Sequence, residues 1–298
     1  MTSDWGAVCA WCSGPAGPAA GRLAACTQCG AATTWPPPDE QELRVDYDGW
    51  YRPATGRFSG GGDLLLRLSR GGLARRLERV APPGPVLDVG CGDGALLDGL
   101  AARGREALGL ERAAARRDVR ACEVTDFSER NGEWAAVVFW HSLEHLWQPA
   151  AALDRACELL MPGGVLAIAI PNRASWQARI FGERWFALDL PRHLVHLPAA
   201  ALLDRLTADG LEIGWVSYWR GGQVTFGWLH GLVGCLPGHP SLYDAIRQAP
   251  ARSRPMSPLT RACALAAGTV LSPVAFVLAV AEIAARAGGT VYVEARRR

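Results

Sequence analysis

The sequence predicts an α/β fold built on a mostly parallel, doubly wound sheet. Three observations support this prediction. Short apolar runs alternate with helically periodic segments throughout residues 39–221. A glycine-rich turn directly follows the first of these runs, as it does between strand and helix in nucleotide-binding sheets. The fifth run, at residues 165–170, is continuously apolar, as strands buried on both faces of a parallel sheet are.

Seven strands are expected from the apolar runs and from one alternating segment near the carboxyl end. In chain order they cover residues 86–89, 107–110, 121–124, 134–140, 165–170, 211–219 and 290–296. Helices are indicated by leucines at helical spacing, by proline at a helix start and by glycine after a helix end. They cover residues 63–80, 95–103, 149–161 and 198–209.

Composition divides the chain into four parts. Residues 1–38 are rich in Cys, Gly, Ala and Pro, and they end in three consecutive prolines that form a stiff spacer. Residues 39–221 hold the core of the sheet. Residues 222–289 are apolar and interrupted by Gly and Pro, and we expect a helical insert there. Residues 290–298 supply the final strand of the core and an arginine tail.

The bulk charge disfavours a nucleic-acid partner. The chain has 298 residues and a formal net charge of only +2, whereas nucleic-acid enzymes usually carry a stronger basic excess. Residues 1–8 lack the basic run and apolar stretch of a secretory signal, so we expect a cytoplasmic protein. Nine cysteines in such a protein indicate metal binding or buried thiols rather than disulfides.

Four of the cysteines form two Cys-x2-Cys pairs. Cys9 and Cys12 make the first pair, and Cys26 and Cys29 make the second. Four thiolates at this spacing suit one tetrahedral ion with no open position, so we expect structural Zn2+ in a zinc ribbon. The alternative is a chance pairing of cysteines in a disordered leader. Only one basic residue, Arg22, lies between the pairs, which does not indicate phosphate binding.

The glycine-rich turn reads Asp-Val-Gly-Cys-Gly-Asp-Gly at residues 88–94. It lies between an expected strand and an expected helix, where backbone N–H groups can approach a ligand. Glu111 closes the second strand, where an acidic residue binds ribose hydroxyls in nucleotide-binding sheets. Asp126 follows the third strand and can accept a hydrogen bond from an exocyclic amine.

This turn resembles motif I of the class I S-adenosylmethionine-dependent methyltransferases, and later segments continue the resemblance in order. Glu111 and Asp126 follow the next two strands, His-Ser-Leu-Glu-His at residues 141–145 follows the fourth, and Met-Pro-Gly-Gly at residues 161–164 precedes the fifth. The resemblance covers about residues 60–220 and the last strand. It implies a Rossmann-like, seven-stranded methyltransferase sheet that binds S-adenosylmethionine.

The resemblance also implies which residues hold this cofactor. Asp88, Gly90 and Gly92 would face the methionine part, Glu111 the ribose and Asp126 the adenine. The whole implied site comprises Asp88, Gly90, Cys91, Gly92, Glu111, Asp126 and His141. The alternative is a nicotinamide dinucleotide domain, which shares the strand, loop and helix. The later motifs favour the methyltransferase.

Four of the six histidines follow the fourth and fifth strands, at the edge of the sheet where doubly wound folds bind ligands. We expect His141 or His193 to act as general base, with His145 and His196 behind them. A base is needed only for a weakly acidic hydroxyl or amine, because the sulfonium methyl group is already activated. Two alternatives are that Glu144 and His145 shape the cofactor pocket, and that His141 and His145 bind a metal.

The insert contains a long uncharged stretch. Residues 262–281 carry no charge and reach the length of a membrane-spanning helix. The final strand must return to the same sheet, however, so a single crossing would leave it on the wrong side. Pro273 favours a break, and residues 224–236 can pair with the stretch as a hairpin. We therefore expect a lid, a dimer contact or a membrane-surface hairpin. Arginines between the two stretches suit anionic headgroups: Arg247, Arg252, Arg254 and Arg261.

These observations predict methyl transfer to a small, lipophilic acceptor such as a quinone, a glycolipid or a secondary metabolite. The alternative is an RNA methyltransferase that uses the zinc ribbon for recognition, which the weak net charge and the apolar insert disfavour. A non-catalytic binding module is a third candidate. The intact glycine turn, with Glu111 and Asp126, argues against it.

Overall fold

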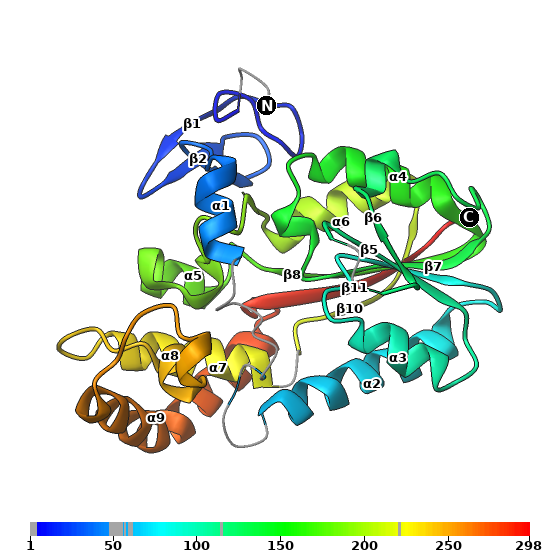
Figure 1. Ribbon diagram of the computed structural model, residues 1–298. Coiled ribbons are helices and arrows are strands. Elements are labelled where there is room, and N and C mark those ends of the chain that lie inside the picture. The colour runs from blue at the N-terminus through cyan, green and yellow to red at the C-terminus, as the bar shows by residue number, and fades with distance from the viewer. Residues whose placement is uncertain (1–4, 48–55, 57, 59–61, 114–115, 220–221) are drawn as a thin grey trace.

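The structure is a computed structural model that describes residues 5–47, 56, 58, 62–113, 116–219 and 222–298 (Figure 1). The strands of its central sheet are β4 (Val86–Val89), β5 (Ala107–Glu111), β6 (Val119–Ala121), β7 (Trp134–Trp140), β8 (Leu160–Pro171), β10 (Glu212–Ser217) and β11 (Thr290–Arg296). Their order is β10-β11-β8-β7-β4-β5-β6. β11 is antiparallel to both of its neighbours, and the other pairs are parallel. The predicted Rossmann-like, seven-stranded sheet is confirmed.

β4 lies between β5 and β7, where the strand order changes direction. Val86 pairs with Ala107 on one side and with Ala136 on the other. Such a switch point opens a crevice at the carboxyl ends of the strands, because the loops on its two sides diverge. The glycine turn after β4 and the segment after β7 therefore meet at this crevice.

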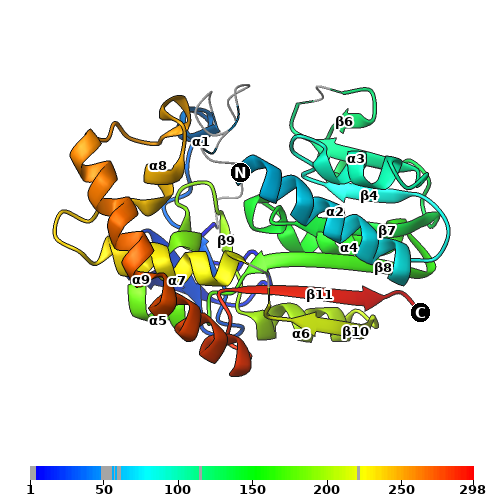
Figure 2. The ribbon, with the colours of Figure 1, turned by 90° about the horizontal axis from the view of Figure 1, so that it is seen from below.

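Helices cover both faces of the sheet (Figures 1 and 2). α2 (Gly62–Val80) and α3 (Ala95–Ala101) lie on one face, and α4 (Pro149–Leu159) and α6 (Ala199–Ala208) lie on the other. Successive residues of β4 contribute to different layers. Val86 belongs to the same buried cluster as Leu77 of α2, and Leu87 to the same cluster as Leu153 of α4. The sheet is thus buried on both sides, as its apolar runs predict.

The third expected strand, at residues 121–124, is wrong in its position, since β6 ends at Ala121. β6 is the edge strand, and its last residue lies opposite Glu111, where β5 ends. The residues that follow therefore have no strand beside them to pair with. They form a short 3-10 helix, η1 (Val124–Asp126), instead.

The insert between β10 and β11 is helical, as expected. Its helices are α7 (Gly222–Gly234), α8 (Leu242–Ile246) and α9 (Pro258–Ala284). α9 packs along α7. The break expected at Pro273 is wrong, because α9 continues through it. Pro273 lacks the N–H that would reach the Thr269 carbonyl, and the Ser272 hydroxyl donates to that carbonyl at 2.8 Å instead.

A buried carboxylate joins the insert to α5 (Trp176–Phe181), which follows β8. One oxygen of Glu282 in α9 accepts a hydrogen bond from the backbone N–H of Gln177 at 3.0 Å. The other oxygen accepts from the Gln177 side chain at 2.8 Å and from the Trp228 indole at 2.9 Å. Burial raises the pKa of Glu282. This carboxylate therefore holds α5, α7 and α9 in one arrangement.

We expect Glu282→Ala to lower the free energy of unfolding by about 3 kcal/mol, because three buried donors lose their acceptor. Glu282→Gln keeps one acceptor oxygen and should be less destabilising. Urea unfolding followed by circular dichroism measures both changes. An alanine variant as stable as the unmodified protein would contradict the role given to Glu282.

A second, smaller sheet contains the amino-terminal strands β1 (Ala16–Ala19), β2 (Leu23–Cys26) and β3 (Ala32–Thr34) together with β9 (Val195–His196). Its order is β1-β2-β3-β9, and all of its pairs are antiparallel. α1 (Glu40–Tyr47) follows β3. This sheet thus combines strands from two distant parts of the chain. The division of the chain at residues 38, 221 and 289 stays a prediction.

Candidate active site

The glycine turn after β4 requires glycine for two reasons. Gly90, Gly92 and Gly94 all have positive φ angles, of 75°, 62° and 75°. A Cβ atom on Gly90 would also lie 2.5 Å from the Cβ of Ser142, in the segment after β7. The turn and that segment can therefore approach closely only because residue 90 has no side chain.

Glu111 lies at the end of β5, beside this turn. One of its carboxylate oxygens accepts a hydrogen bond from the Gly92 N–H at 2.9 Å, and the other accepts from the Arg112 N–H at 3.0 Å. These two bonds fix the carboxylate at the carboxyl edge of the sheet. A cavity of about 630 Å³ opens there, and residues that line it include Gly90, Gly92, Glu111, Glu123, His141 and Trp147.

Three residues of the expected cofactor site are not among those that line this cavity, and one of them, Asp88, is buried. Cys91 is buried, and its Sγ points toward β5, where a Cβ atom on Gly109 would meet it at 2.4 Å. Asp126 ends η1, and the cavity is lined instead by Glu123 and Val124. Sequence reasoning missed Glu123 because it placed the third strand too late. With the strand ending at Ala121, Glu123 is the first acidic residue after it.

A second cavity, of about 330 Å³, adjoins the first, and His141 and His145 line both. One wall comes from the segment after β8 and includes Asp189, Arg192 and His193. The opposite wall comes from the insert, with Gln223, His230, Tyr243 and Asp244 among its residues. The insert thus completes a chamber next to the glycine turn, and the chamber has many polar side chains.

A buried carboxylate lies at the junction of the two cavities. Glu144 is 3 % exposed, and its Oε1 lies 3.3 Å from Nδ1 of His141 and 3.9 Å from Nε2 of His193. Burial acts to raise the pKa of Glu144, but His141, followed by the charges of His193 and His145, outweighs it and lowers the pKa to about 2. The carboxylate is therefore ionised at neutral pH.

His145 and His196 are poor candidates for a general base. Burial, followed by the charge of His193, lowers the pKa of His145 to about 4. The same two causes lower the pKa of His196 to about 3. Bases with such pKa values remove protons weakly at neutral pH. His145 lines both cavities, whereas His196 is buried and is not among the residues that line either.

His141 and His193 both line the second cavity. Nε2 of His141 lies 3.2 Å from the side-chain oxygen of Gln223 in α7. Nδ1 of His193 lies 2.8 Å from the Ala187 carbonyl, so this nitrogen carries a proton and donates it. Nε2 of His193 then faces Glu144 and Asp189, 3.7 Å from Oδ2 of the latter. A base at either position can contact a molecule in this cavity.

The residues that could hold a metal ion at this site are not the pair His141 and His145 named from the sequence. Among the described residues, Glu144, His145 and His193 place their ligand atoms within 4.8 Å of one another. His193 thus supplies the third ligand that the sequence did not place near His145. His141 is not part of that set.

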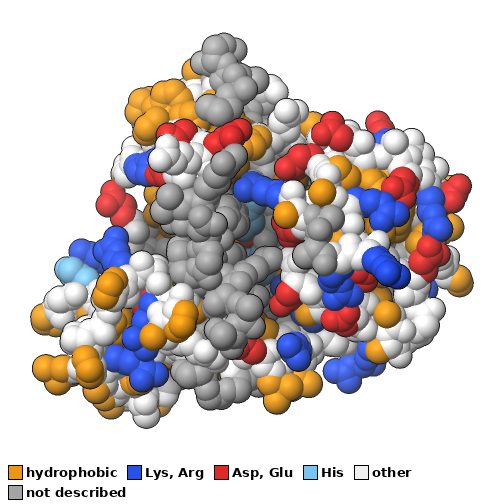
Figure 3. All heavy atoms as spheres, in the orientation of Figure 1, with side chains coloured by type: hydrophobic (Ala, Val, Ile, Leu, Met, Phe, Trp, Pro, Cys, Tyr) orange, Lys and Arg blue, Asp and Glu red, His pale blue; other side chains and the backbone are white. Residues whose placement is uncertain are grey.

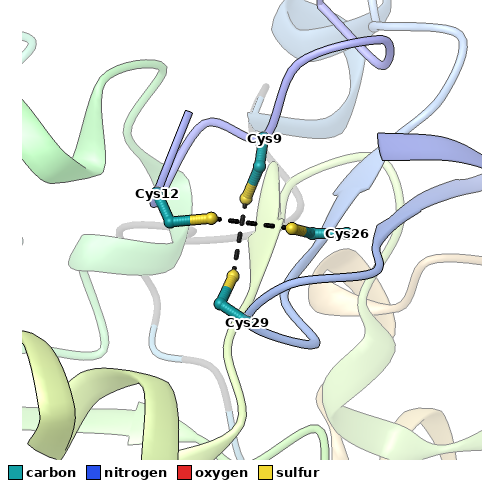
Figure 4. Close-up of side chains that lie close together, drawn as sticks. All are labelled: Cys9, Cys12, Cys26 and Cys29. Carbon is teal, nitrogen blue, oxygen red and sulfur yellow. Dashed lines mark hydrogen bonds between the residues drawn. The ribbon is translucent and has the colours of Figure 1, made fainter. Parts of the chain in front are cut away.

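The four amino-terminal cysteines converge on one point, as Figure 4 shows. Sγ of Cys9 lies 3.7 Å from that of Cys29, and Sγ of Cys12 lies 3.5 Å from that of Cys26. Backbone N–H groups of Trp11 and Gln28 donate to two of these sulfurs, each at 3.4 Å. Burial acts to raise the pKa of Cys26, but bonds from the backbone N–H groups of Cys29 and Gln28 outweigh it and lower the pKa to about 7. The set fits a tetrahedral metal ion.

The strand order, the glycine turn and the carboxylate after β5 define a class I methyltransferase fold. A family model described as a methyltransferase domain matches residues 65–214, which is half of the chain. The chain belongs to this family.

Relatives and solved structures agree with this assignment. The chain is 32% identical over 136 residues to a ubiquinone biosynthesis O-methyltransferase of Xanthomonas campestris, covering 40% of this chain and 57% of that protein. It is 30% identical over 161 residues to the same-named protein of Xanthomonas axonopodis, covering 47% and 67%. A chain from the complex between the Haloferax volcanii Trm112 methyltransferase activator and a methyltransferase matches with a TM-score of 0.51 at 13% identity, covering 85% and 96%. The last match supports the fold alone.

Proposed function

We propose that this protein transfers a methyl group from S-adenosylmethionine to a small acceptor held in the second cavity. The observation that carries this proposal is the pair of adjoining cavities, which meet at His141 and His145. The first has the glycine turn and Glu111 on its wall, as a methyl-donor site requires. The second is large enough for one substituted ring and lies next to it.

The cofactor site combines expected residues with one new residue. Gly90 and Gly92 would contact the methionine part, with Asp88 buried beneath them, and Glu111 would bind the ribose hydroxyls. Glu123 is better placed than Asp126 to accept a hydrogen bond from the adenine amine, because it lines the cavity. When bound, S-adenosylmethionine supplies a methyl group that is already activated by its positive sulfur.

We expect Gly90→Ala to weaken binding of S-adenosylhomocysteine by at least about tenfold, since the new Cβ atom collides with Ser142. Gly104→Ala is the matched control. It has nearly the same φ angle, 72°, but nothing lies within 4 Å of its added Cβ. Isothermal titration calorimetry measures both affinities. If the two variants bind equally well, the glycine turn is not the cofactor site.

The protein's main contribution to the reaction is alignment, because the donor is already activated. With a hydroxyl acceptor in the second cavity, the acceptor oxygen would take the methyl group as the bond from that carbon to the sulfur breaks. The proton lost by the acceptor passes to Nε2 of His193 or to His141. The ionised Glu144 lies beside both imidazoles and stabilises the positive charge that either gains.

We expect His193→Asn to lower kcat by about a hundredfold or more, if an alkylcatechol is used as acceptor probe. Asparagine keeps a donor for the Ala187 carbonyl but cannot take the proton. His141→Asn tests the other candidate, and His239→Asn, at an exposed site, is the control. If His193→Asn keeps its turnover at saturating substrate, His193 is not the base. The same criterion applies to His141.

The acceptor that these walls favour has a polar head and an apolar remainder. The second cavity is lined by both polar and apolar side chains, and the insert that closes it carries an apolar outer surface. The curated relatives named above are ubiquinone biosynthesis O-methyltransferases, which agrees with a quinol or catechol acceptor. A mass search for methylated products in cell extracts incubated with the enzyme would identify the molecule itself.

The amino-terminal cysteines would hold structural zinc. Four thiolates fill a tetrahedral shell, so such a metal would stabilise the segment rather than act on the acceptor. We expect about one equivalent of zinc per freshly purified chain, measured by plasma mass spectrometry. Cys26→Ser with Cys29→Ser should lose it. Cys235→Ser with Cys263→Ser, at exposed positions, should keep it. Less than half an equivalent in the unmodified protein would contradict the zinc site.

The insert would attach the protein to the membrane surface. α9 is the one helix among the described residues that is long and apolar enough to span a bilayer, and 22% of its most apolar window is buried. β11 returns to the sheet directly after α9, so we place the helix along the membrane plane. Figure 3 shows hydrophobic side chains gathered at the lower left, over this region. Exposed apolar residues of α9 are Leu259, Val270, Val274, Phe276, Val277 and Val280.

We expect the protein to sediment with phosphatidylglycerol vesicles and less with phosphatidylcholine vesicles, because Arg252 and Arg254 before α9 attract anionic headgroups. Arg247, expected among these arginines, is fully buried and cannot reach a headgroup. Val270→Asp with Val277→Asp should lower the bound fraction several-fold. A protein that stays in the supernatant with both vesicle types contradicts membrane attachment. If the same two substitutions split a dimer, α9 is instead a contact between two copies.

A further inference from the structure

The cysteine module, which comprises the four amino-terminal cysteines and strands β1 to β3, shares its small sheet with the segment that carries His193. In this small sheet Ala32 of β3 pairs with His196 of β9, and Thr33 pairs with Val195. Cys29, a member of the second cysteine pair, lies three residues before β3 begins. The metal-binding knuckle and the wall of the second cavity are therefore joined through one short strand.

Thr34, the last residue of β3, makes hydrogen bonds to the candidate base His193 and to the residue after it. Its side chain is fully buried, and its hydroxyl donates to the carbonyl of His193 at 2.6 Å. Its backbone N–H donates to the carbonyl of Leu194 at 2.9 Å. The hydroxyl oxygen also lies 3.3 Å from Nε2 of His196, and it accepts from that nitrogen because its own proton is given to His193.

Hydrogen bonds to the backbone and from the ring of His193 together fix the position of its side chain. Thr34 binds the carbonyl, and the ring donates through Nδ1 to Ala187 at 2.8 Å. The next residue, Leu194, donates its N–H to the carbonyl of Glu144 at 2.8 Å. A shift of β3 would move the His193 backbone and, with it, the direction in which Nε2 faces the cavity.

The module has further contacts that limit how far it can shift. The Trp5 indole donates to the Thr34 carbonyl at 3.0 Å, and its ring lies 5.0 Å from that of Trp147, which lines the first cavity. Arg173, just after β8, donates to the carbonyl of Gly30 at 3.0 Å. The module is thus fixed to the walls of both cavities.

We propose that the cysteine module is a positioning element of the acceptor cavity and that Thr34 is the residue through which it sets the place of His193. The inference rests on the proposed role of His193 as base. It gives the module a function inside its own active site, without requiring that it recognise a separate partner.

Thr34→Val tests the proposal by removing the hydroxyl at nearly constant volume. We expect kcat with the alkylcatechol probe to fall about tenfold to a hundredfold, while the affinity for S-adenosylhomocysteine and the zinc content stay unchanged. Thr34→Ser restores the hydroxyl and should recover most of the activity. Thr33→Val is the matched control, because the buried Thr33 hydroxyl has no hydrogen-bond partner within the described part of the chain. Equal kcat values in the two valine variants would overturn the proposal.

A readout independent of activity separates this proposal from the proposed function. Hydrogen–deuterium exchange of the full chain should rise about tenfold across residues 187–196 in Thr34→Val but not in Thr33→Val. Removal of the metal by a chelator should produce the same rise. Unchanged exchange in Thr34→Val overturns the positioning role even if His193 is the base. If exchange rises in Thr34→Val while His193→Asn keeps full turnover, the positioning role is supported and His193 is rejected as the base.

Discussion

The burial of one charge, that of Glu144, organises the active site. A buried carboxylate is stable only when paired, and the imidazoles of His141 and His193 lie 3.3 and 3.9 Å from this one. The pairing draws together the segment after β7, which carries His141 and His145, and the segment after β8, which carries His193. The backbone carbonyl of Glu144 strengthens the link by accepting from Leu194. The glycine turn, the two cavities and the small sheet all take their positions relative to these two segments.

A second buried carboxylate does similar work at the outer wall. Glu282 holds α9 and α7 against α5, so the insert closes the second cavity in one defined arrangement. Gln177 serves both structures, since it binds Glu282 and also lines the second cavity. The wall of the second cavity and the exposed apolar side chains of α9 therefore belong to one folded unit.

Sequence reasoning succeeded where a local pattern determines the structure. Continuous apolar runs located β4, β7 and β8, and the glycine-rich pattern located the turn at residues 90–94. It failed where the outcome depends on a neighbour. Because β6 ends where β5 ends, the acidic residue that lines the cavity is Glu123 rather than Asp126. α9 continues through Pro273 because Ser272 supplies the hydrogen bond that Pro273 cannot. The pairing of β3 with β9 joins segments far apart, through a strand of two residues with no periodicity to detect.

The position of β11 has a consequence for how the chain matures. This strand is the last of the central sheet to be synthesised, yet it lies between β10 and β8 rather than at an edge. Until residues 290–296 leave the ribosome, β8 presents an open, apolar edge to the cell and β10 has no partner in the sheet. A nascent chain must therefore keep this gap protected, and a chain cut short before β11 would leave β10 separated from the rest of the sheet.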